Sequence, residues 1–337
     1  MPIVSVIMPM YNSVDFVRQA IDSILQQTFA DLEIIAINDG STDGCADVVS
    51  QINDERLTFI DRENHGFVNT LNECIELAKG KYIARLDDDD WSYPDRIKKQ
   101  VEYFEAHPDT VLVGTLCDEY RDGQITKVKE TPVRTPNQIR FGLIFGNFAF
   151  AHSSFMMRRD VLIYNSIRYE VFKQVPDYHM ITQLYPYGKI ARIQEPLVVY
   201  RIHGAQSTQV RSSRMKQDES DNARAWFVDT LPLNAEEKRA VKKGILRKLK
   251  TKEDIESFDA VIEKYKDLCG IDRIKDKECI GFLYDYCMLT QFCSPSLLAS
   301  FIRCSKRKWL LSSKGLKFAI KCILKRNPAY LETTVEI

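Results

Sequence analysis

The stretch Lys81-Tyr82-Ile83-Ala84-Arg85-Leu86-Asp87-Asp88-Asp89-Asp90 joins an apolar run directly to four consecutive aspartates. The apolar run predicts a buried strand, and the aspartates follow where that strand would end. Four neighbouring negative charges repel one another, so a strand gains nothing by ending in this way. We therefore expect a positive group here, and a divalent cation carrying a phosphorylated ligand fits because hard cations prefer carboxylate oxygens. The alternative interpretation is a solvated acidic turn.

Strand-like and helix-like patterns alternate through the first hundred residues. Apolar runs predict strands at residues 4–8 (ended by Pro9), 32–37, 57–61 and 82–86. Helical periodicity predicts helices at residues 15–27, 45–51 and 68–78. This alternation predicts an α/β fold with a mostly parallel sheet that helices cover on both faces.

Three polar loops follow strands of the predicted sheet, at residues 9–12, 38–43 and 87–90. Sheets of this kind bind ligands beyond the carboxyl ends of their strands. Because all three loops fall at that edge, we expect them to form one site.

Length and charge limit the classes of protein to consider. The 337 residues allow one large and one smaller domain, and charged helical segments after residue 211 predict domains at 1–211 and 212–337. Lysine plus arginine equal aspartate plus glutamate at 47 each, which does not favour a nucleic-acid partner. Nine cysteines without a CxxC pair, and no recognisable signal peptide, predict a cytoplasmic protein with reduced thiols.

The C-terminal region carries a separate basic segment. Nine basic residues and no acidic one lie between positions 294 and 331. Within residues 303–326 an apolar helical face is rimmed by lysines, which is typical of a helix lying on an anionic membrane surface. The alternative is an amphipathic helix packed on its own domain. We therefore expect a cytoplasmic protein that can lie peripherally on the inner face of the cell membrane.

The loop motifs together resemble glycosyltransferase family 2. They are Ser5-Val6-Ile7-Met8-Pro9-Met10-Tyr11-Asn12, Asn38-Asp39-Gly40-Ser41-Thr42-Asp43 and the aspartate stretch quoted above. The match continues through His152-Ser153-Ser154, Asp177-Tyr178 and Tyr200-Arg201-Ile202-His203, so it covers about residues 3–208. The resemblance implies the GT-A fold, a nucleotide-diphosphate sugar as donor and inversion at the anomeric carbon. Within the family, the middle segment is most similar to bacterial lipooligosaccharide and capsule enzymes that add β-1,3-linked N-acetylhexosamine or hexose.

The resemblance also implies roles for residues. Asp89 would bind Mn²⁺ or Mg²⁺ bridging the diphosphate, Asp87 would reach the ribose or the metal, and His203 would close on the metal or diphosphate. The uracil ring would meet Asp39 and lie against Pro9 and Tyr11. The nucleotide site is thus assigned to Pro9, Tyr11, Asn12, Asp39, Arg85 and Asp87, and the acceptor side to His152, Ser153 and Ser154. Alternatives stay open: Arg85 could steady the aspartates, Asp88 or Asp90 could share the metal, and Asp90 could cap a turn.

Asp177 is the predicted general base for the acceptor hydroxyl. The family stretch usually reads Glu-Asp-Tyr, whereas this chain has Pro176-Asp177-Tyr178. Proline suits the first turn of a helix, here expected over residues 177–185, but the lost glutamate could also mean a weakened site. The leading prediction is a metal-dependent transferase whose donor is UDP-GlcNAc, UDP-GalNAc, UDP-Gal or UDP-Glc. It would move the sugar to a hydroxyl of a growing lipopolysaccharide, O-antigen or capsule, and the acceptor would be a glycan or a lipid-linked molecule. The alternatives are a catalytically silent sugar-nucleotide-binding subunit and a nucleotidyltransferase, the latter disfavoured because no glycine-rich phosphate loop follows the first strand.

Overall fold

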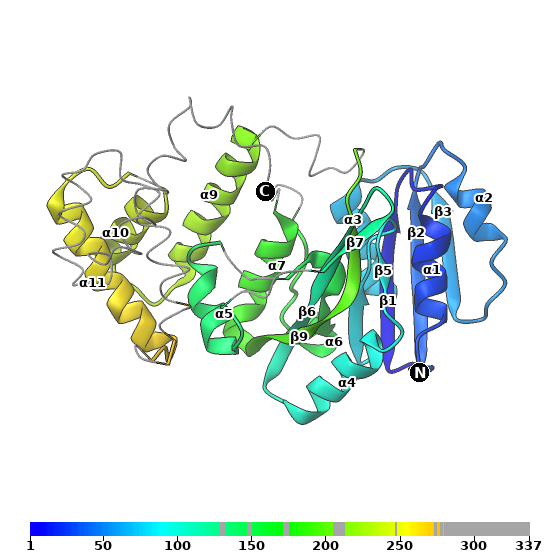
Figure 1. Ribbon diagram of the computed structural model, residues 1–337, viewed down its shortest axis with the longest axis horizontal. Helices are drawn as coiled ribbons and strands as arrows, with labels where there is room; N and C mark the ends of the chain where they lie inside the picture. The colour runs from blue at the N-terminus through cyan, green and yellow to red at the C-terminus, as the bar shows by residue number, and fades with distance from the viewer. Residues whose placement is uncertain are drawn as a thin grey trace. The chain divides into compact units, whose positions relative to one another are not determined.

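The computed structural model describes residues 1–127, 132–146, 150–170, 175–204, 213–246, 248–272, 275–276 and 279 (Figure 1). The chain divides into two compact units, Met1–Pro136 with Phe148–Glu219, and Asn137–Asn147 with the residues from Ser220 onward. The segment Asn137–Asn147 belongs to the second unit although it precedes residue 211 in the sequence. The functional division into a catalytic and a helical domain stays a prediction. The predicted basic helix at 303–326 lies outside the described residues.

Among the described residues, one nine-stranded sheet forms the centre of the first unit. Its order is β3-β2-β1-β4-β8-β6-β9-β5, with β7 paired to β6. The strands are β1 (Val4–Met10), β2 (Leu32–Asp39), β3 (Leu57–Arg62), β4 (Tyr82–Arg85), β5 (Trp91–Ser92), β6 (Thr110–Arg121), β7 (Gln124–Thr126), β8 (Met156–Arg158) and β9 (Lys189–Arg201). The strands β3, β2, β1 and β4 are parallel, as expected, and so are β6 and β9. In contrast, β8 runs antiparallel to β4 and β6, and β5 and β7 are also antiparallel to their neighbours, so the sheet is mixed.

Helices cover both faces of the parallel half of the sheet (Figure 1). The helices of the first unit are α1 (Val17–Leu25), α2 (Cys45–Ser50), α3 (Phe67–Leu77), α4 (Arg96–Ala106), the 3-10 turn η1 (His152–Ser154), α6 (Arg159–Tyr164), α7 (Pro176–Leu184) and η2 (Tyr185–Tyr187). Successive side chains of a strand point to opposite faces. On one face, Val4, Val6 and Met8 of β1 share a buried core with apolar residues of α1, α2 and α4. On the other, α3 packs on β1 and β2, and the Cys74 thiol lies 3.9 Å from the Ile35 carbonyl oxygen.

Strand β1 continues past the point where the sequence predicts its end. Pro9 is a buried member of the strand, paired with Ile37 of β2, and β1 ends at Met10. A proline within a sheet normally removes a ladder hydrogen bond. Here Ile7 is the last residue of β1 that pairs with β4, so Pro9 lies beyond that neighbour. The prediction that Pro9 stops the strand is therefore wrong.

The described part of the second unit is helical. Its helices are α5 (Pro136–Leu143), the part of α9 (Ser213–Thr230) from Ser220 onward, α10 (Ala235–Ile245) and α11 (Lys252–Leu268). Helix α5 begins at Pro136, the last residue of its segment of the first unit. Capping boxes begin α10 and α11, in which Asn234 pairs with Glu237 and Thr251 with Asp254. In the part of the chain that the structure describes, no helix is long and apolar enough to span a membrane.

Candidate active site

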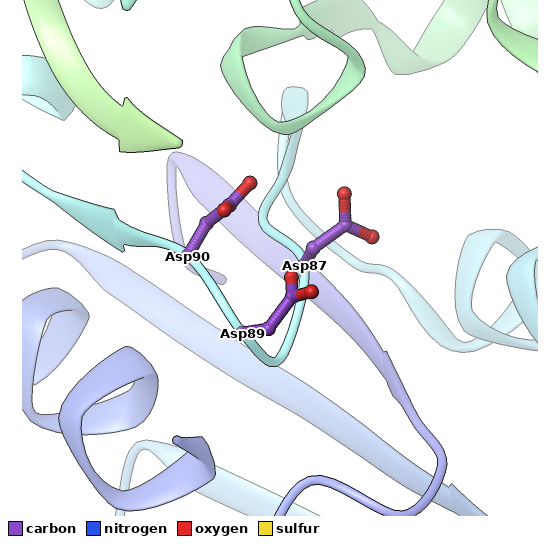
Figure 2. Close-up of side chains that lie close together, drawn as sticks. All are labelled: Asp87, Asp89 and Asp90. Atoms are coloured by element: carbon purple, nitrogen blue, oxygen red, sulfur yellow. The ribbon is translucent and has the colours of Figure 1, made fainter. Parts of the chain in front are cut away.

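The four aspartates occupy the short connection between β4 and β5. The Leu86 amide still donates to the Ile7 carbonyl (3.2 Å), and the buried guanidinium of Arg96 donates to the Arg85 carbonyl (2.6 Å), which fixes the end of β4. The chain then turns, with the Asp90 amide 3.3 Å from the Asp87 carbonyl oxygen. Carboxylate oxygens of Asp87, Asp89 and Asp90 lie within 4.8 Å of one another, and the three side chains project to the same side of the loop (Figure 2). The loop therefore brings three of its four carboxylates close together instead of exposing each one separately to solvent.

Arg85 neutralises Asp87. The guanidinium is almost fully buried and contacts both carboxylate oxygens of Asp87, one of them at 2.7 Å. Charge-assisted, two-pronged pairs of this kind hold a carboxylate in a fixed orientation. The structure thus places Arg85 where it steadies the aspartates, as one of the two sequence interpretations has it.

Asp90 is buried and held by two groups. Its carboxylate accepts the Arg201 backbone N–H at 2.8 Å and contacts the Ser153 hydroxyl at 2.5 Å. Ser153 also contacts Asp87 at 2.7 Å, yet a hydroxyl has one hydrogen and can donate to one carboxylate only. Burial, followed by the charges of Asp89 and Asp87, raises the pKa of Asp90 well above its usual range, so Asp90 can hold a proton and donate to Ser153. These contacts tie Asp90 to β9 and η1, and the turn-capping interpretation is not needed.

Asp89 contacts His203. The His203 Nε2 atom lies 2.9 Å from one Asp89 oxygen, and both side chains are about one-fifth exposed. Burial and the Asp87 charge raise the pKa of Asp89. Arg85 engages Asp87 and the Arg201 backbone N–H engages Asp90, whereas the side-chain partner of Asp89 is the His203 imidazole. Three carboxylates and one imidazole are a suitable set of donors for Mn²⁺ or Mg²⁺.

Asp88 is not one of the three clustered carboxylates and instead contacts the loop after β1. Its carboxylate accepts the Tyr11 backbone N–H at 2.9 Å. Burial and the Asp89 charge raise the pKa of Asp88 to about 7. Asp88 therefore links two of the three predicted loops rather than joining the triad of Asp87, Asp89 and Asp90.

The loops after β1 and β2 are also bound to each other. Asn12 has a left-handed backbone (φ 51°), its amide donates to the Ser41 hydroxyl, and its side-chain oxygen accepts the Thr42 amide, both at 2.9 Å. The Tyr11 ring next to it is 55% exposed, which leaves a face open for stacking. All three loops thus meet at one edge of the sheet, as the sequence predicts.

Asp39 lies in the same region but is already paired. It is nearly buried, and it accepts from the Arg62 guanidinium (2.5 Å) and the His65 amide (2.8 Å). Burial opposes ionisation of Asp39, but the hydrogen bonds from His65 and Arg62 outweigh it and lower the pKa. Contact with a base, which the resemblance implies for Asp39, stays a prediction.

Asp177 lies in the first turn of α7, which begins at Pro176. The proline takes the helix position where a missing N–H costs least, so its presence has a plain structural reason. Asp177 accepts the Tyr178 amide at 2.7 Å. Burial raises the pKa of Asp177, while Arg85 lowers it and Asp87 raises it further. The charges of Arg85 and Asp87 therefore both act on the Asp177 carboxylate.

The three residues assigned to the acceptor side have different surroundings. His152 Nε2 lies 2.7 Å from the Tyr169 hydroxyl, and burial, with the Arg85 charge, lowers the pKa of His152 well below its usual range. Ser154 is fully buried and donates to the Ala151 carbonyl (2.7 Å), which suits a structural turn. Ser153 contacts the aspartates, as described above. An acceptor role for the three stays a prediction.

The sequence did not single out Tyr169 or Arg62. The side chain of Asn72 bonds both the Tyr169 amide and its carbonyl, each at 2.9 Å, and this fixes the Tyr169 ring beside His152. Burial raises the pKa of the Tyr169 hydroxyl; the Arg85 charge opposes this rise, and the charges of Asp177 and Asp87 add to it. Because these partners are dispersed along the chain, no local pattern indicates the contacts.

A family model, a relative similar in sequence and two solved structures similar in fold were found by comparison with known proteins. A family model described as glycosyl transferase family 2 matches residues 5–164. An uncharacterized glycosyltransferase of Haemophilus influenzae is 33% identical over 229 residues, which are 62% of this chain and 68% of the relative. In fold, the chain is similar to S. aureus TarS 1–349 in complex with UDP-GlcNAc, with a TM-score of 0.58, 15% identity, and coverage of 91% and 90% of the two chains. It is also similar to the mannosyltransferase PcManGT from Pyrobaculum calidifontis in complex with GDP-Man and Mn²⁺, with a TM-score of 0.52, 16% identity, and coverage of 98% and 85%. These likenesses confirm the α/β GT-A fold class that the sequence predicts.

Proposed function

The chain belongs to glycosyltransferase family 2 and is a glycosyltransferase, and from that premise we propose that it is a metal-dependent, inverting enzyme that uses a UDP-sugar. The proposed acceptor is a hydroxyl of a growing bacterial surface glycan, either free or lipid-linked. The proposed cofactor is Mn²⁺ or Mg²⁺. The donor sugars considered remain UDP-GlcNAc, UDP-GalNAc, UDP-Gal and UDP-Glc.

The observation that carries this proposal is the cluster of Asp87, Asp89 and Asp90 beside His203. Burial, followed by the charges of neighbouring aspartates, raises the pKa of both Asp89 and Asp90, so the group is poorly stabilised without added positive charge. A relative in fold, PcManGT, has a structure with GDP-Man and Mn²⁺, and TarS has one with UDP-GlcNAc. These neighbours support a metal and a nucleotide sugar as ligands here.

Asp89 and His203 would hold the cation, with Asp87 and Asp90 beside them. When bound, the ion would neutralise the charge of the leaving diphosphate. Tyr11 would offer its exposed ring to the base, and Asn12 would keep that loop in place through Ser41 and Thr42. The raised pKa values of Asp89 and Asp90 are consistent with the fit of a cation to this site.

Asp177 would take the proton from the acceptor hydroxyl. Its carboxylate is fixed by the Tyr178 amide, and burial makes it a stronger base than an ordinary aspartate. The deprotonated oxygen would attack the anomeric carbon opposite the diphosphate, which inverts that centre. The carboxylic acid of Asp177 would then release the proton to solvent.

We also keep the proposal that the enzyme works on the cytoplasmic face of the membrane, where lipid-linked acceptors are found. The support is the basic sequence at residues 303–326. Vesicle flotation with and without anionic lipid tests this part separately from catalysis.

The main experiment measures Mn²⁺ affinity, UDP affinity and release of UDP from the four UDP-sugars. Asp89→Asn should abolish Mn²⁺-dependent UDP binding, whereas Asp47→Asn, an exposed aspartate of α2, should leave it unchanged. Binding of UDP by the wild type without Mn²⁺ dependence would contradict the metal assignment. Binding of donor without any turnover would favour the silent-subunit alternative.

A further inference from the structure

Arg201, at the end of β9, is enclosed by three aromatic rings. Its guanidinium carbon lies 4.7 Å from the ring centroids of Phe16 and Trp91 and 5.0 Å from that of Tyr120. These rings, which we call the aromatic clamp, come from the start of α1, from β5 and from β6. A guanidinium is planar and weakly hydrated, so it can stack against rings while it donates hydrogen bonds in its own plane.

The same arginine holds two residues of the acidic loop. Its Nε atom donates to the Asp89 carbonyl oxygen at 2.8 Å, and its backbone N–H donates to the Asp90 carboxylate at 2.8 Å. Its Nη2 atom donates to the Gln19 side chain at 2.6 Å. One residue therefore fixes both the backbone at Asp89 and the side chain of Asp90.

Phe16 connects this arrangement to His203. Its ring centroid lies 4.7 Å from that of His203, which follows Arg201 by two positions and contacts Asp89. Phe16 thus contacts both the arginine that holds the loop and the imidazole beside it. Displacement of Arg201 would move Asp89, Asp90 and His203 together.

We propose that Arg201, held in the aromatic clamp, is a positioning residue that keeps Asp89, Asp90 and His203 in the arrangement that binds the cation. The inference rests on the proposed function for its consequence in metal binding. Its structural part, that Arg201 orders the acidic loop, stands on the contacts alone. Arg201 itself is not assigned contact with donor or acceptor.

The test compares Arg201→Lys with Arg192→Lys. Arg192 is a matched control because it is also buried in β9, where it donates to the Val133 carbonyl instead of the acidic loop. Hydrogen exchange of peptides covering residues 86–92 is measured in metal-free protein, and Mn²⁺ affinity is measured by titration with MnCl₂. Phe16→Leu is the second variant. It removes a ring face from a half-buried position, so the test remains decisive if Arg201→Lys fails to fold.

We expect Arg201→Lys to speed exchange of residues 86–92 at least about tenfold and to weaken Mn²⁺ binding by a similar factor, with Phe16→Leu smaller in the same direction. Arg192→Lys should change neither quantity more than about twofold. Unchanged exchange in both Arg201→Lys and Phe16→Leu would overturn the inference, and so would faster exchange with wild-type Mn²⁺ affinity. If the wild type binds no Mn²⁺, the proposed function fails, while the exchange measurement still decides whether Arg201 orders the loop.

Discussion

Replacing Asp88 by asparagine should stabilise the metal-free protein at neutral pH. Burial and the neighbouring Asp89 charge raise the pKa of Asp88 to about 7, against 3.8 for an ordinary aspartate. Between these two values the folded protein keeps a proton that the unfolded chain has released. The free energy of unfolding therefore falls as pH rises from about 4 to about 7.

The size of the effect follows from the same shift. A difference of about three pKa units corresponds to about 4 kcal/mol at pH 7 as an upper limit. The Asp88 side chain is partly exposed, and solvent screening reduces this to on the order of 2 kcal/mol. Asparagine cannot ionise, yet its side-chain oxygen can still accept the Tyr11 N–H that Asp88 accepts at 2.9 Å. The variant should thus gain on the order of 2 kcal/mol at neutral pH and almost nothing near pH 4.

Urea denaturation in EDTA, followed by circular dichroism at several pH values between 4 and 7.5, measures the difference. Asp54→Asn is the control of opposite sign, since hydrogen bonds from Arg56 lower the pKa of Asp54 to about 2 and its loss should destabilise the protein throughout this range. Mn²⁺ should reduce the advantage of Asp88→Asn, because the proposed cation at Asp89 would lower the pKa of Asp88. An advantage that is the same at pH 4 and pH 7.5, or a loss of stability at pH 7.5, would refute the reasoning.

Two further predictions concern catalysis and the sheet. Asp177→Asn should lower kcat by about 10²–10⁴-fold. Because burial raises the pKa of Asp177, the kcat/KM of the wild type should begin to fall, as pH decreases, at a pH above the ordinary aspartate pKa. If the variant shows the same loss of kcat/KM at low pH as the wild type, that result counts against Asp177 as the base. Gly80→Ala should lower the free energy of unfolding by about 2–3 kcal/mol, since the new Cβ would lie 2.5 Å from the Ser5 nitrogen in β1. Urea denaturation should show no comparable loss for Gly204→Ala, because among the described residues, chain neighbours apart, no atom lies within 4 Å of the added Cβ. Equal losses would contradict the steric argument.

The parallel half of the fold follows from local sequence because its strands are apolar runs. The pattern predicts β1, β2, β3 and β4 within a few residues, and α1, α2 and α3 likewise. Helix α4 was not predicted. Two of its buried positions are the polar residues Arg96 and Gln100, which bond backbone carbonyl oxygens and hide the apolar periodicity. Strands β5 and β8 have two and three residues, too few for a repeating pattern.

The location of the site could be predicted from the sequence, but the contacts between its side chains could not. Carboxyl ends of parallel strands meet at one edge, so the convergence of three loops could be inferred from their positions. The partners inside the site could not be inferred, because they depend on packing between distant segments. Arg201 meets Phe16, Trp91 and Tyr120 from three segments, and the separate roles of Asp88 and Asp90 depend on which way each side chain points.

The position of His203 affects when the enzyme can first act during its own synthesis. The contact between His203 and Asp89 spans 114 positions of the chain. At a translation rate of about 5–20 residues per second, roughly 6 to 23 s pass between the synthesis of Asp89 and that of His203. During that interval the nascent chain carries its aspartates without the His203 imidazole. Arg201 is also missing until almost the end of the interval, and Ser153 is missing for the first part of it. On the proposed function, a nascent chain should therefore bind neither cation nor donor until His203, two residues beyond the end of β9, has emerged from the ribosome.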